Sequence, residues 1–255
     1  MSQPAAVAPD FAGKVALITG GTRGIGLGIA EELVRRGARV VITARKPDEL
    51  TVAVEQLGGA ETAIGVRGSS DDEEHQADAV AQAVRRFGSL DLLVNNAAVN
   101  PHYGPLVDAP LDAVRKIFEV NVTATLGWLQ QAWRAHMQAN GGAVLGVASV
   151  GGLRAGAPIG AYNASKAALI HLTRQLAVEL GPTVRVNAIA PAVVKTRFAR
   201  ALFEHDEEGV AAAYPMKRLG VPADTAAAAA FLLSDAASWI TGETLVVDGG
   251  ITAGH

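Results

Sequence analysis

The feature that most constrains this chain is a regular alternation of short aliphatic runs with longer helix-like stretches. The aliphatic runs are almost continuously apolar, which is typical of strands that a sheet buries on both faces. These runs predict strands at residues 15–19, 39–43, 63–66, 90–95, 143–148, 184–189 and 244–247. The stretches between them predict helices at residues 25–36, 47–57, 72–87, 111–138, 160–180 and 222–233.

Strands and helices that alternate in this way indicate a parallel sheet covered by helices on both faces. No linker or change of composition divides the pattern. We therefore predict an α/β fold in a single domain over residues 11–255, a doubly wound parallel sheet of about seven strands. Residues 1–10, which hold two prolines and several small side chains, are predicted to be a loose N-terminal tail.

Composition narrows the functional classes. The chain has no cysteine, which excludes disulfides, a thiol nucleophile and cysteine-bound zinc. Its net charge of −3 disfavours a nucleic-acid partner, because such proteins normally carry a basic surplus. No apolar run approaches the roughly 18 residues of a membrane span, and no secretory signal is expected. We predict a cytoplasmic protein without a membrane or nucleic-acid partner.

Two segments interrupt the alternation, and both follow predicted strands. Residues 100–110 are rich in proline and glycine and predict a loop. Residues 195–219 combine acidic side chains with the large apolar residues Phe198, Leu202 and Phe203. Open α/β sheets bind ligands beyond the carboxyl ends of their strands. The second segment is therefore predicted to be a substrate loop.

A glycine-rich turn follows the first predicted strand and opens the next helix. Glycines permit positive φ angles and let backbone N–H groups approach a pyrophosphate, and a helix N-terminus favours an anion. A purely structural turn is the alternative, but the position between strand and helix favours dinucleotide binding. The residues predicted to bind the cofactor here are Gly20, Thr22, Arg23, Gly24, Ile25 and Gly26.

The end of the second predicted strand indicates which dinucleotide is bound. An acidic residue about twenty positions past the glycine turn accepts the ribose hydroxyls of NAD. Here Ala44 and Arg45 offer no carboxylate. Arg45, together with Arg23, instead suits a dianionic 2′-phosphate, because a guanidinium binds phosphate through two hydrogen bonds. NADP(H) is the predicted cofactor, and two solvated surface arginines are the alternative.

Tyr162 and Lys166 lie four residues apart in the predicted helix 160–180, and therefore on one face. A free tyrosine titrates at about pH 10, and a cation one turn away is expected to lower the pKa of the phenol. Ser149 ends the fifth predicted strand, where its hydroxyl can hydrogen-bond a substrate carbonyl. The three side chains predict an acid–base site.

A serine hydrolase is the competing interpretation of Ser149, and the local sequence argues against it. A nucleophile elbow needs a glycine two residues before the serine, and Val147 stands there. None of the 6 histidines shows a zinc-binding spacing, so no metal site is predicted.

Asn121 is a polar residue in the apolar stripe of the predicted helix 111–138. A buried amide must find hydrogen-bond partners. Two interpretations stay open: the amide braces the helix, or it holds a water or a carbonyl near the active site.

With these motifs the chain resembles the short-chain dehydrogenase/reductases over nearly its whole length. The matching motifs are residues 19–26, Asn95-Asn96-Ala97-Ala98, Asn121, Ser149, Tyr162 with Lys166, Asn187-Ala188-Ile189-Ala190-Pro191 and residues 240–250. The resemblance implies a Rossmann-like fold and a catalytic tetrad of Asn121, Ser149, Tyr162 and Lys166. It implies that the tyrosine is the general acid or base, the serine orients the carbonyl, the lysine holds the nicotinamide ribose and the asparagine supports a proton relay.

The resemblance also assigns further residues to the cofactor. The positions expected to line it are Asn95, Ala97, Pro191, Val194 and Thr196. Three positions depart from the family pattern, since Ala98 and Ala192 replace glycines and Ser69 replaces an aspartate that commonly contacts the adenine. These departures are expected to alter adenine affinity without abolishing cofactor binding.

A homotetramer is expected from the same resemblance, because family members usually assemble through the helices that correspond to residues 111–138 and 160–180. The side chains suggested for such a subunit seam are Trp128, Leu129, Trp133, Ala164, Ala168 and His171. Ordinary core packing of these residues is the alternative.

The resulting prediction is an oxidoreductase that transfers hydride between NADP(H) and a carbonyl or alcohol substrate, with small or medium hydrophobic ketones or aldehydes preferred. The resemblance is greatest to NADP-dependent carbonyl reductases and 3-oxoacyl-carrier-protein reductases. Acidic residues in 195–219 outnumber Arg197 and Arg200, which disfavours an acidic carrier protein as substrate. The alternatives are a 3-oxoacyl-carrier-protein reductase, an NAD-dependent secondary-alcohol dehydrogenase and a non-catalytic dinucleotide sensor.

Overall fold

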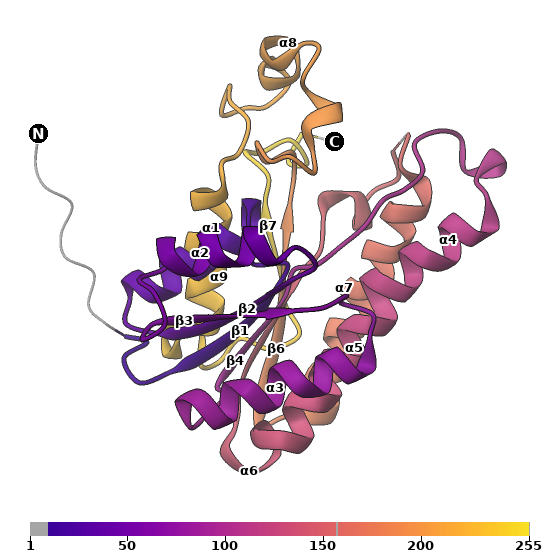
Figure 1. Cartoon of the computed structure of the whole chain (residues 1–255). Helices are drawn as coiled ribbons and strands as arrows, with labels where there is room; N and C mark the ends of the chain where they lie inside the picture. Colours follow the sequence, from indigo (N-terminus) through magenta and orange to yellow (C-terminus); the bar gives the residue numbers. More distant parts are fainter. Residues whose placement is uncertain (1–9, 157, 255) are drawn as a thin grey trace, which may run out of the picture.

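The computed structural model describes residues 10–156 and 158–254. Within these residues, seven parallel strands form one central sheet in the order β3-β2-β1-β4-β5-β6-β7 (Figure 1). The strands are β1 (Val15–Thr19), β2 (Arg39–Ala44), β3 (Ala63–Arg67), β4 (Leu92–Asn95), β5 (Gly142–Val147), β6 (Val184–Pro191) and β7 (Thr244–Val247). The predicted doubly wound parallel sheet is confirmed. Its strand order reverses between β1 and β4, which is where such sheets bind ligands.

Helices cover both faces of the sheet (Figure 1). One face packs against α1 (Gly24–Arg35), α2 (Pro47–Gln56) and α9 (Pro222–Leu233). The other face packs against α3 (Glu73–Phe87), α5 (Ala124–Ala132) and α7 (Gly160–Leu180). The central strands between these layers are almost wholly buried, which explains why they read as continuous aliphatic runs. The edge strands β3 and β7 are partly exposed.

The boundaries of several elements differ from the predicted ones. β4 begins at Leu92 rather than at residue 90, and just before it the Asp91 carboxylate accepts a hydrogen bond from the Val15 N–H at 2.9 Å. β6 continues to Pro191, which pairs with Val247 of β7. These differences leave the order of the elements unchanged.

The predicted helix 111–138 is not continuous. It consists of α4 (Leu111–Phe118), a π-helical turn η2 (Glu119–Thr123), α5, a second π-helical turn η3 (Trp133–Met137) and α6 (Gln138–Asn140). A π-helical turn inserts one extra residue into the helix and is frequent at functional sites. Here the first turn contains Asn121.

Trp128 and Leu129, which the sequence suggests for a subunit seam, are core residues of this chain. Trp128 is 1% exposed, and its indole Nε1–H donates to the Ser70 carbonyl at 3.0 Å. Leu129 is buried in the same layer between α5 and the sheet. The suggestion is wrong for these two residues, because the apolar stripe that they share faces inward.

The two predicted interruptions lie beyond the carboxyl ends of the strands. Residues 100–110 form a loop with one 3₁₀ turn, η1 (Leu106–Asp108). Residues 195–219 contain η5 (Arg200–Leu202) and α8 (Glu207–Ala212), and they project from the sheet in Figure 1. Further 3₁₀ turns follow β5 and α9, at η4 (Val150–Gly152) and η6 (Asp235–Ala237).

The predicted N-terminal tail, apart from Asp10, lies outside the described residues. Among the helices that the structure describes, none combines the length and apolarity needed to cross a membrane.

Candidate active site

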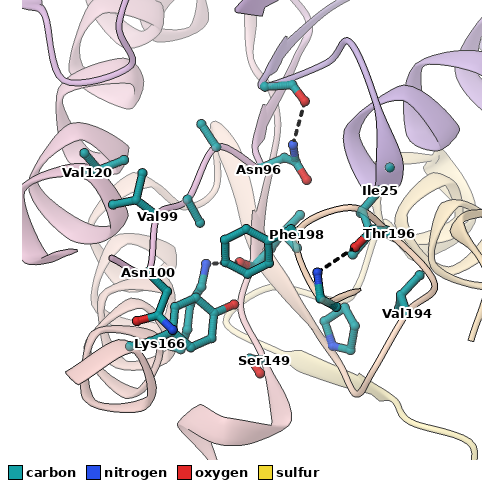
Figure 2. A pocket seen from close by; sticks show the side chains of 18 of the residues that line it. Ile25, Asn96, Val99, Asn100, Val120, Ser149, Lys166, Val194, Thr196 and Phe198 are labelled. Atoms are coloured by element: carbon teal, nitrogen blue, oxygen red, sulfur yellow. Dashed lines mark hydrogen bonds between the residues drawn. The ribbon is translucent and has the colours of Figure 1, made fainter. Parts of the chain in front are cut away.

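A cavity of about 580 Å³ opens at the carboxyl edge of the sheet. Its walls come from the glycine turn, the ends of β2, β4 and β5, the first turns of α7 and the segment after β6. Motifs that are far apart in the sequence therefore meet in one space. Figure 2 shows Ile25, Val194 and Thr196 on one side of it and Ser149 and Lys166 on another. The volume is within the range of small-molecule sites.

The glycine turn has the backbone that its sequence predicts. Gly20 and Gly24 adopt φ angles of +64° and +56°, which other residues rarely reach. Gly24 begins α1, and the Arg23 side chain does not cap that helix. The first N–H groups of α1 therefore remain suited to a pyrophosphate. A side chain at Gly24 would crowd Thr196, since its Cβ would lie 3.1 Å from the Thr196 methyl.

Asn96 holds the turn in place. Its Nδ2 donates to the carbonyls of Thr19 at 2.8 Å and Gly20 at 3.1 Å. Its own N–H donates to the Thr19 hydroxyl at 3.0 Å. The end of β4 is thereby tied to the end of β1, and the cavity wall between them is fixed.

Ser149, Tyr162 and Lys166 line the same cavity. Lys166 is 2% exposed, and its Nζ donates to the Val147 carbonyl at 2.6 Å. The same nitrogen lies 5.4 Å from the centre of the Tyr162 ring. Ser149 follows the end of β5, and its hydroxyl accepts a hydrogen bond from the Gly151 N–H at 3.1 Å.

Burial controls the protonation of this group. It raises the pKa of the Tyr162 phenol far above its usual value, although a hydrogen bond with Ser149 acts in the opposite direction. Burial also lowers the pKa of Lys166 to about 7. The sequence predicts instead that Lys166 lowers the pKa of Tyr162. In this structure that prediction is wrong, because the loss of solvent around the phenol raises its pKa and Ser149, rather than Lys166, is the group that lowers it.

Asn121 acts through the backbone of its neighbours. Its Oδ1 accepts from the Val99 N–H at 2.9 Å, and its Nδ2 donates to the Val99 carbonyl at 3.1 Å and the Ser165 hydroxyl at 3.0 Å. Val99 lines the cavity, whereas Asn121 lies behind it at 1% exposure. Of the two interpretations, this geometry favours the second, because the amide holds the Val99 carbonyl at the wall of the cavity.

The opposite lobe of the cavity is cationic. Arg23, Arg45 and Lys46 line it, at the ends of the glycine turn and of β2. Glu49, which the sequence analysis does not single out, also lines this lobe and forms an ion pair with Arg23.

Comparisons with known proteins agree with this geometry. A family model described as enoyl-(acyl carrier protein) reductase matches residues 20–252. Dehydrogenase/reductase SDR family member 4 of Sus scrofa is 42% identical over 244 residues, covering 93% of this chain and 86% of that protein. The chain belongs to the short-chain dehydrogenase/reductase family. Tropinone reductase-like 3 of Erythroxylum coca is 40% identical over 244 residues, with 94% and 93% coverage.

Solved structures of the family show the same fold. A short-chain type dehydrogenase/reductase from Mycobacterium ulcerans superposes with a TM-score of 0.90 at 35% identity, covering 96% of this chain and 91% of that chain. One from Brucella melitensis, titled as a glucose/ribitol dehydrogenase, gives a TM-score of 0.91 at 29% identity, with 96% and 99% coverage. The chain is therefore an oxidoreductase of a family that uses nicotinamide dinucleotides.

Most residues predicted for the site of this short-chain dehydrogenase/reductase line the cavity. Besides Ser149, Tyr162 and Lys166, these are Gly20, Thr22, Arg23, Gly24, Ile25, Arg45, Ala97, Pro191, Val194 and Thr196. The glycine turn fits a pyrophosphate and the cationic lobe fits a further anion, so the residues present could hold a nicotinamide dinucleotide.

Two residues predicted to bind the cofactor lie away from the cavity. Asn95 is 5% exposed and donates to the Thr125 carbonyl at 3.3 Å, because successive strand side chains point to opposite faces of the sheet. Gly26 lies behind the turn, where a Cβ would come within 2.5 Å of Asn96 Nδ2 and the Gly20 carbonyl. Its role is close packing.

The departures from the family pattern also lie at the cavity. Ala98, Ala192 and Ser69 line it. The Ser69 hydroxyl donates to the Asp71 carboxylate at 2.5 Å. Burial alone would raise the pKa of Asp71, but hydrogen bonds from Lys116 and Ser69 hold it below its usual value. A carboxylate is thus present two residues beyond the position where the family pattern has one.

The walls nearest Tyr162 contain further residues that no sequence motif identifies. Tyr103 and Arg154 line the cavity from the loops after β4 and β5. Phe198, on the predicted substrate loop, has its ring centre 5.8 Å from that of Tyr162. Loop residues of this kind have no fixed spacing, so only the fold brings them together.

Proposed function

We propose that the protein is an NADP(H)-dependent carbonyl reductase acting on small or medium hydrophobic ketones or aldehydes. The observation that carries the proposal is a single cavity with a cationic lobe at one end and Ser149, Tyr162 and Lys166 at the other. Arg23 and Arg45 suit the 2′-phosphate of NADP(H), because a guanidinium binds phosphate through two hydrogen bonds.

Ser149, Tyr162 and Lys166 have separate roles in the proposed carbonyl reduction. The nicotinamide cofactor, when bound, supplies the hydride. The Ser149 hydroxyl hydrogen-bonds the substrate carbonyl, and the Tyr162 phenol donates a proton to the developing alkoxide. A phenol is protonated at neutral pH, as a proton donor must be, and the raised pKa of Tyr162 leaves this unchanged. Lys166 lies one turn further along α7, with its Nζ 5.4 Å from the centre of the Tyr162 ring.

The substrate class follows from the wall beside Tyr162. Phe198 lies beside Tyr162, and Leu202 and Tyr214 also line the cavity with large, mostly apolar surfaces. In the adjoining segment Arg200 is paired with Glu204, and Lys195 with Glu207, so these cations are engaged. Both features support a hydrophobic carbonyl compound over a 3-oxoacyl group on an acidic carrier protein.

The test is an NADPH- and NADH-oxidation screen over ketones, aldehydes, quinones and acetoacetyl thioesters, with wild type and Tyr162→Phe. We expect NADPH-dependent reduction of hydrophobic carbonyls. The variant should lose at least about a hundredfold in kcat, because it lacks the proton donor, and should bind NADPH as wild type does. Wild-type rates in Tyr162→Phe would contradict the role of the tyrosine.

The same screen separates the alternatives. A clear kcat/KM advantage for a carrier-bound thioester would indicate a 3-oxoacyl-carrier-protein reductase. Preference for NADH would indicate an NAD-dependent alcohol dehydrogenase, and cofactor binding without any turnover would indicate a dinucleotide sensor. We further propose a homotetramer, and a location in the reducing cytoplasm, which the absence of cysteine supports.

A further inference from the structure

Glu49 lies in the first turn of α2, and its side chain lines the cationic lobe of the cavity. The exposed Asp48 beside it already places a negative charge at this helix N-terminus. The helix therefore does not require a second acidic residue that points into the cavity.

Three cations from three separate segments surround the Glu49 carboxylate. Arg23 Nη1 lies 2.7 Å from Oε2, while Lys46 Nζ and Arg197 Nη1 lie 3.2 Å and 3.8 Å from Oε1. The hydrogen bond from Lys46 and the charges of Arg23 and Arg197 hold the pKa of Glu49 below its usual value, against the effect of burial. The carboxylate is thus ionised at neutral pH.

These ion pairs contribute little to the stability of the fold. The side chains of Arg23, Lys46 and Arg197 are 52%, 62% and 71% exposed, and exposed ion pairs are weak. A 2′-phosphate would need the same N–H donors that the carboxylate now occupies. It would also be repelled by the carboxylate, because both groups are negative.

We propose that Glu49 is an internal anion that competes with the 2′-phosphate of NADP(H) for Arg23, Lys46 and Arg197, and thereby limits the preference for NADPH over NADH. The inference rests on the proposed NADP(H) site. NADH, with a neutral ribose hydroxyl at this point, meets no such competition. Arg45 lines the same lobe but is not one of the cations that pair with Glu49, so it remains available to the phosphate.

The test replaces the carboxylate by an uncharged isostere and measures the adenosine end of the cofactor alone. Calorimetric titrations use adenosine 2′,5′-bisphosphate and adenosine 5′-monophosphate, which differ only in the 2′-phosphate. We expect Glu49→Gln to bind the bisphosphate about tenfold more tightly at low ionic strength. Binding of the monophosphate should stay within twofold, and the kcat/KM ratio of NADPH to NADH should rise with the bisphosphate affinity.

Glu55→Gln is the matched control. It removes the same charge from the far end of the same helix, where Glu55 is exposed and forms no ion pair with a described residue. We expect wild-type affinities for both nucleotides. Glu49→Ala, which cannot keep the hydrogen bond to Arg23, should also tighten the bisphosphate. For each variant, thermal unfolding shows whether it folds.

Four outcomes would overturn the inference. Three of them are unchanged or weaker bisphosphate binding in both Glu49 variants, equal tightening of the monophosphate, and a similar gain in Glu55→Gln. Weaker NADH binding in Glu49→Gln would also overturn it, since Glu49 would then accept the ribose hydroxyls.

Arg45→Ala tests the proposed cofactor separately. If Arg45 binds the 2′-phosphate, this variant loses about tenfold to a hundredfold in bisphosphate affinity. No loss in Arg45→Ala together with a gain in Glu49→Gln would contradict the role of Arg45 and keep that of Glu49. A loss in Arg45→Ala with no change in Glu49→Gln would keep the role of Arg45 and contradict that of Glu49.

Discussion

At the residue scale, Lys166 combines deep burial with a single neutral partner. Its ammonium donates to the Val147 carbonyl, and no carboxylate in the described part of the chain pairs with it. Burial of an unpaired cation is costly, so the group gives up its proton more readily than a free lysine. Its charge therefore changes near neutral pH, beside a tyrosine that stays protonated.

The stability of the fold should record this titration. The folded pKa of Lys166 is about 7, against 10.5 for a free lysine. Between these values the unfolded chain holds a proton that the folded chain has lost, so the free energy of unfolding rises with pH, by up to about 1.4 kcal/mol per unit. Below about pH 6 both states are charged, and the contribution is constant.

Lys166→Met lacks the titrating group and provides the reference. We expect the difference in unfolding free energy, wild type minus Lys166→Met, to be flat from pH 5 to 6 and to rise from about pH 7 to 9. Urea denaturation at one fixed protein concentration measures it, and the series stops at pH 9 because unfolded tyrosines titrate near pH 10. A difference independent of pH would show that the folded lysine stays charged.

Residue-level predictions succeed where a local rule applies. Gly20 and Gly24 could be predicted because a turn between strand and helix needs positive φ. Asn95 could not be separated from Asn96 in the same way, because which of two adjacent residues at the end of β4 faces the cavity depends on how the fold orients that strand. Glu49 carries no motif, and only the fold brings Arg197 to it.

At the element scale, the types of the helices and strands follow from periodicity, whereas breaks within a helix do not. The apolar stripe through Val114, Ile117 and Trp128 fits one continuous helix. The π-helical turn around Asn121 depends on its hydrogen bonds to Val99, which belongs to a different segment. A tertiary contact of this kind leaves no periodic signal in the sequence.

The segment 195–219 gives the prediction at this scale. If it is the substrate loop, Phe198 should contribute to substrate binding, because its ring lies beside Tyr162 and is about half exposed. We expect Phe198→Ala to raise KM for a hydrophobic carbonyl about tenfold, from roughly 1.5 kcal/mol of lost apolar contact. Steady-state kinetics should show a smaller change in kcat and no change in NADPH affinity.

Met216→Ala is the matched control for that prediction. Met216 belongs to the same segment and is 63% exposed, but it does not line the cavity. Its replacement should leave KM unchanged. Equal effects of the two variants, or none from Phe198→Ala, would contradict the assignment of this segment.

At the scale of the whole molecule, the fold was predictable because burial on two faces leaves a strong signal. Seven aliphatic runs and their intervening helices admit few arrangements other than a doubly wound parallel sheet. Assembly is harder to predict, since an apolar helix face can cover its own sheet or another subunit. Trp128 and Leu129, for example, pack against the sheet of their own chain.

The outer face of α7 is a candidate for contact with another subunit. Ala164, His171 and Val178 are exposed on it, and Val178 is 82% exposed. Small residues let two helices approach closely. The family resemblance implies a homotetramer, and we expect this face to form one of its contacts, with a light-scattering mass of four times 26.2 kDa at micromolar concentration.

Ala164→Glu tests whether α7 forms that seam. A glutamate from each subunit at a close helix contact would bury unpaired like charges, so the variant should dissociate to dimers or monomers while keeping its far-ultraviolet circular dichroism. Ala77→Glu, at an exposed alanine of α3, introduces the same side chain outside the expected seam and should keep the wild-type mass. A monomeric wild type would exclude the tetramer. A tetrameric Ala164→Glu would exclude this face of α7 as the contact, since a buried pair of carboxylates at close approach cannot be accommodated without ion-pair partners.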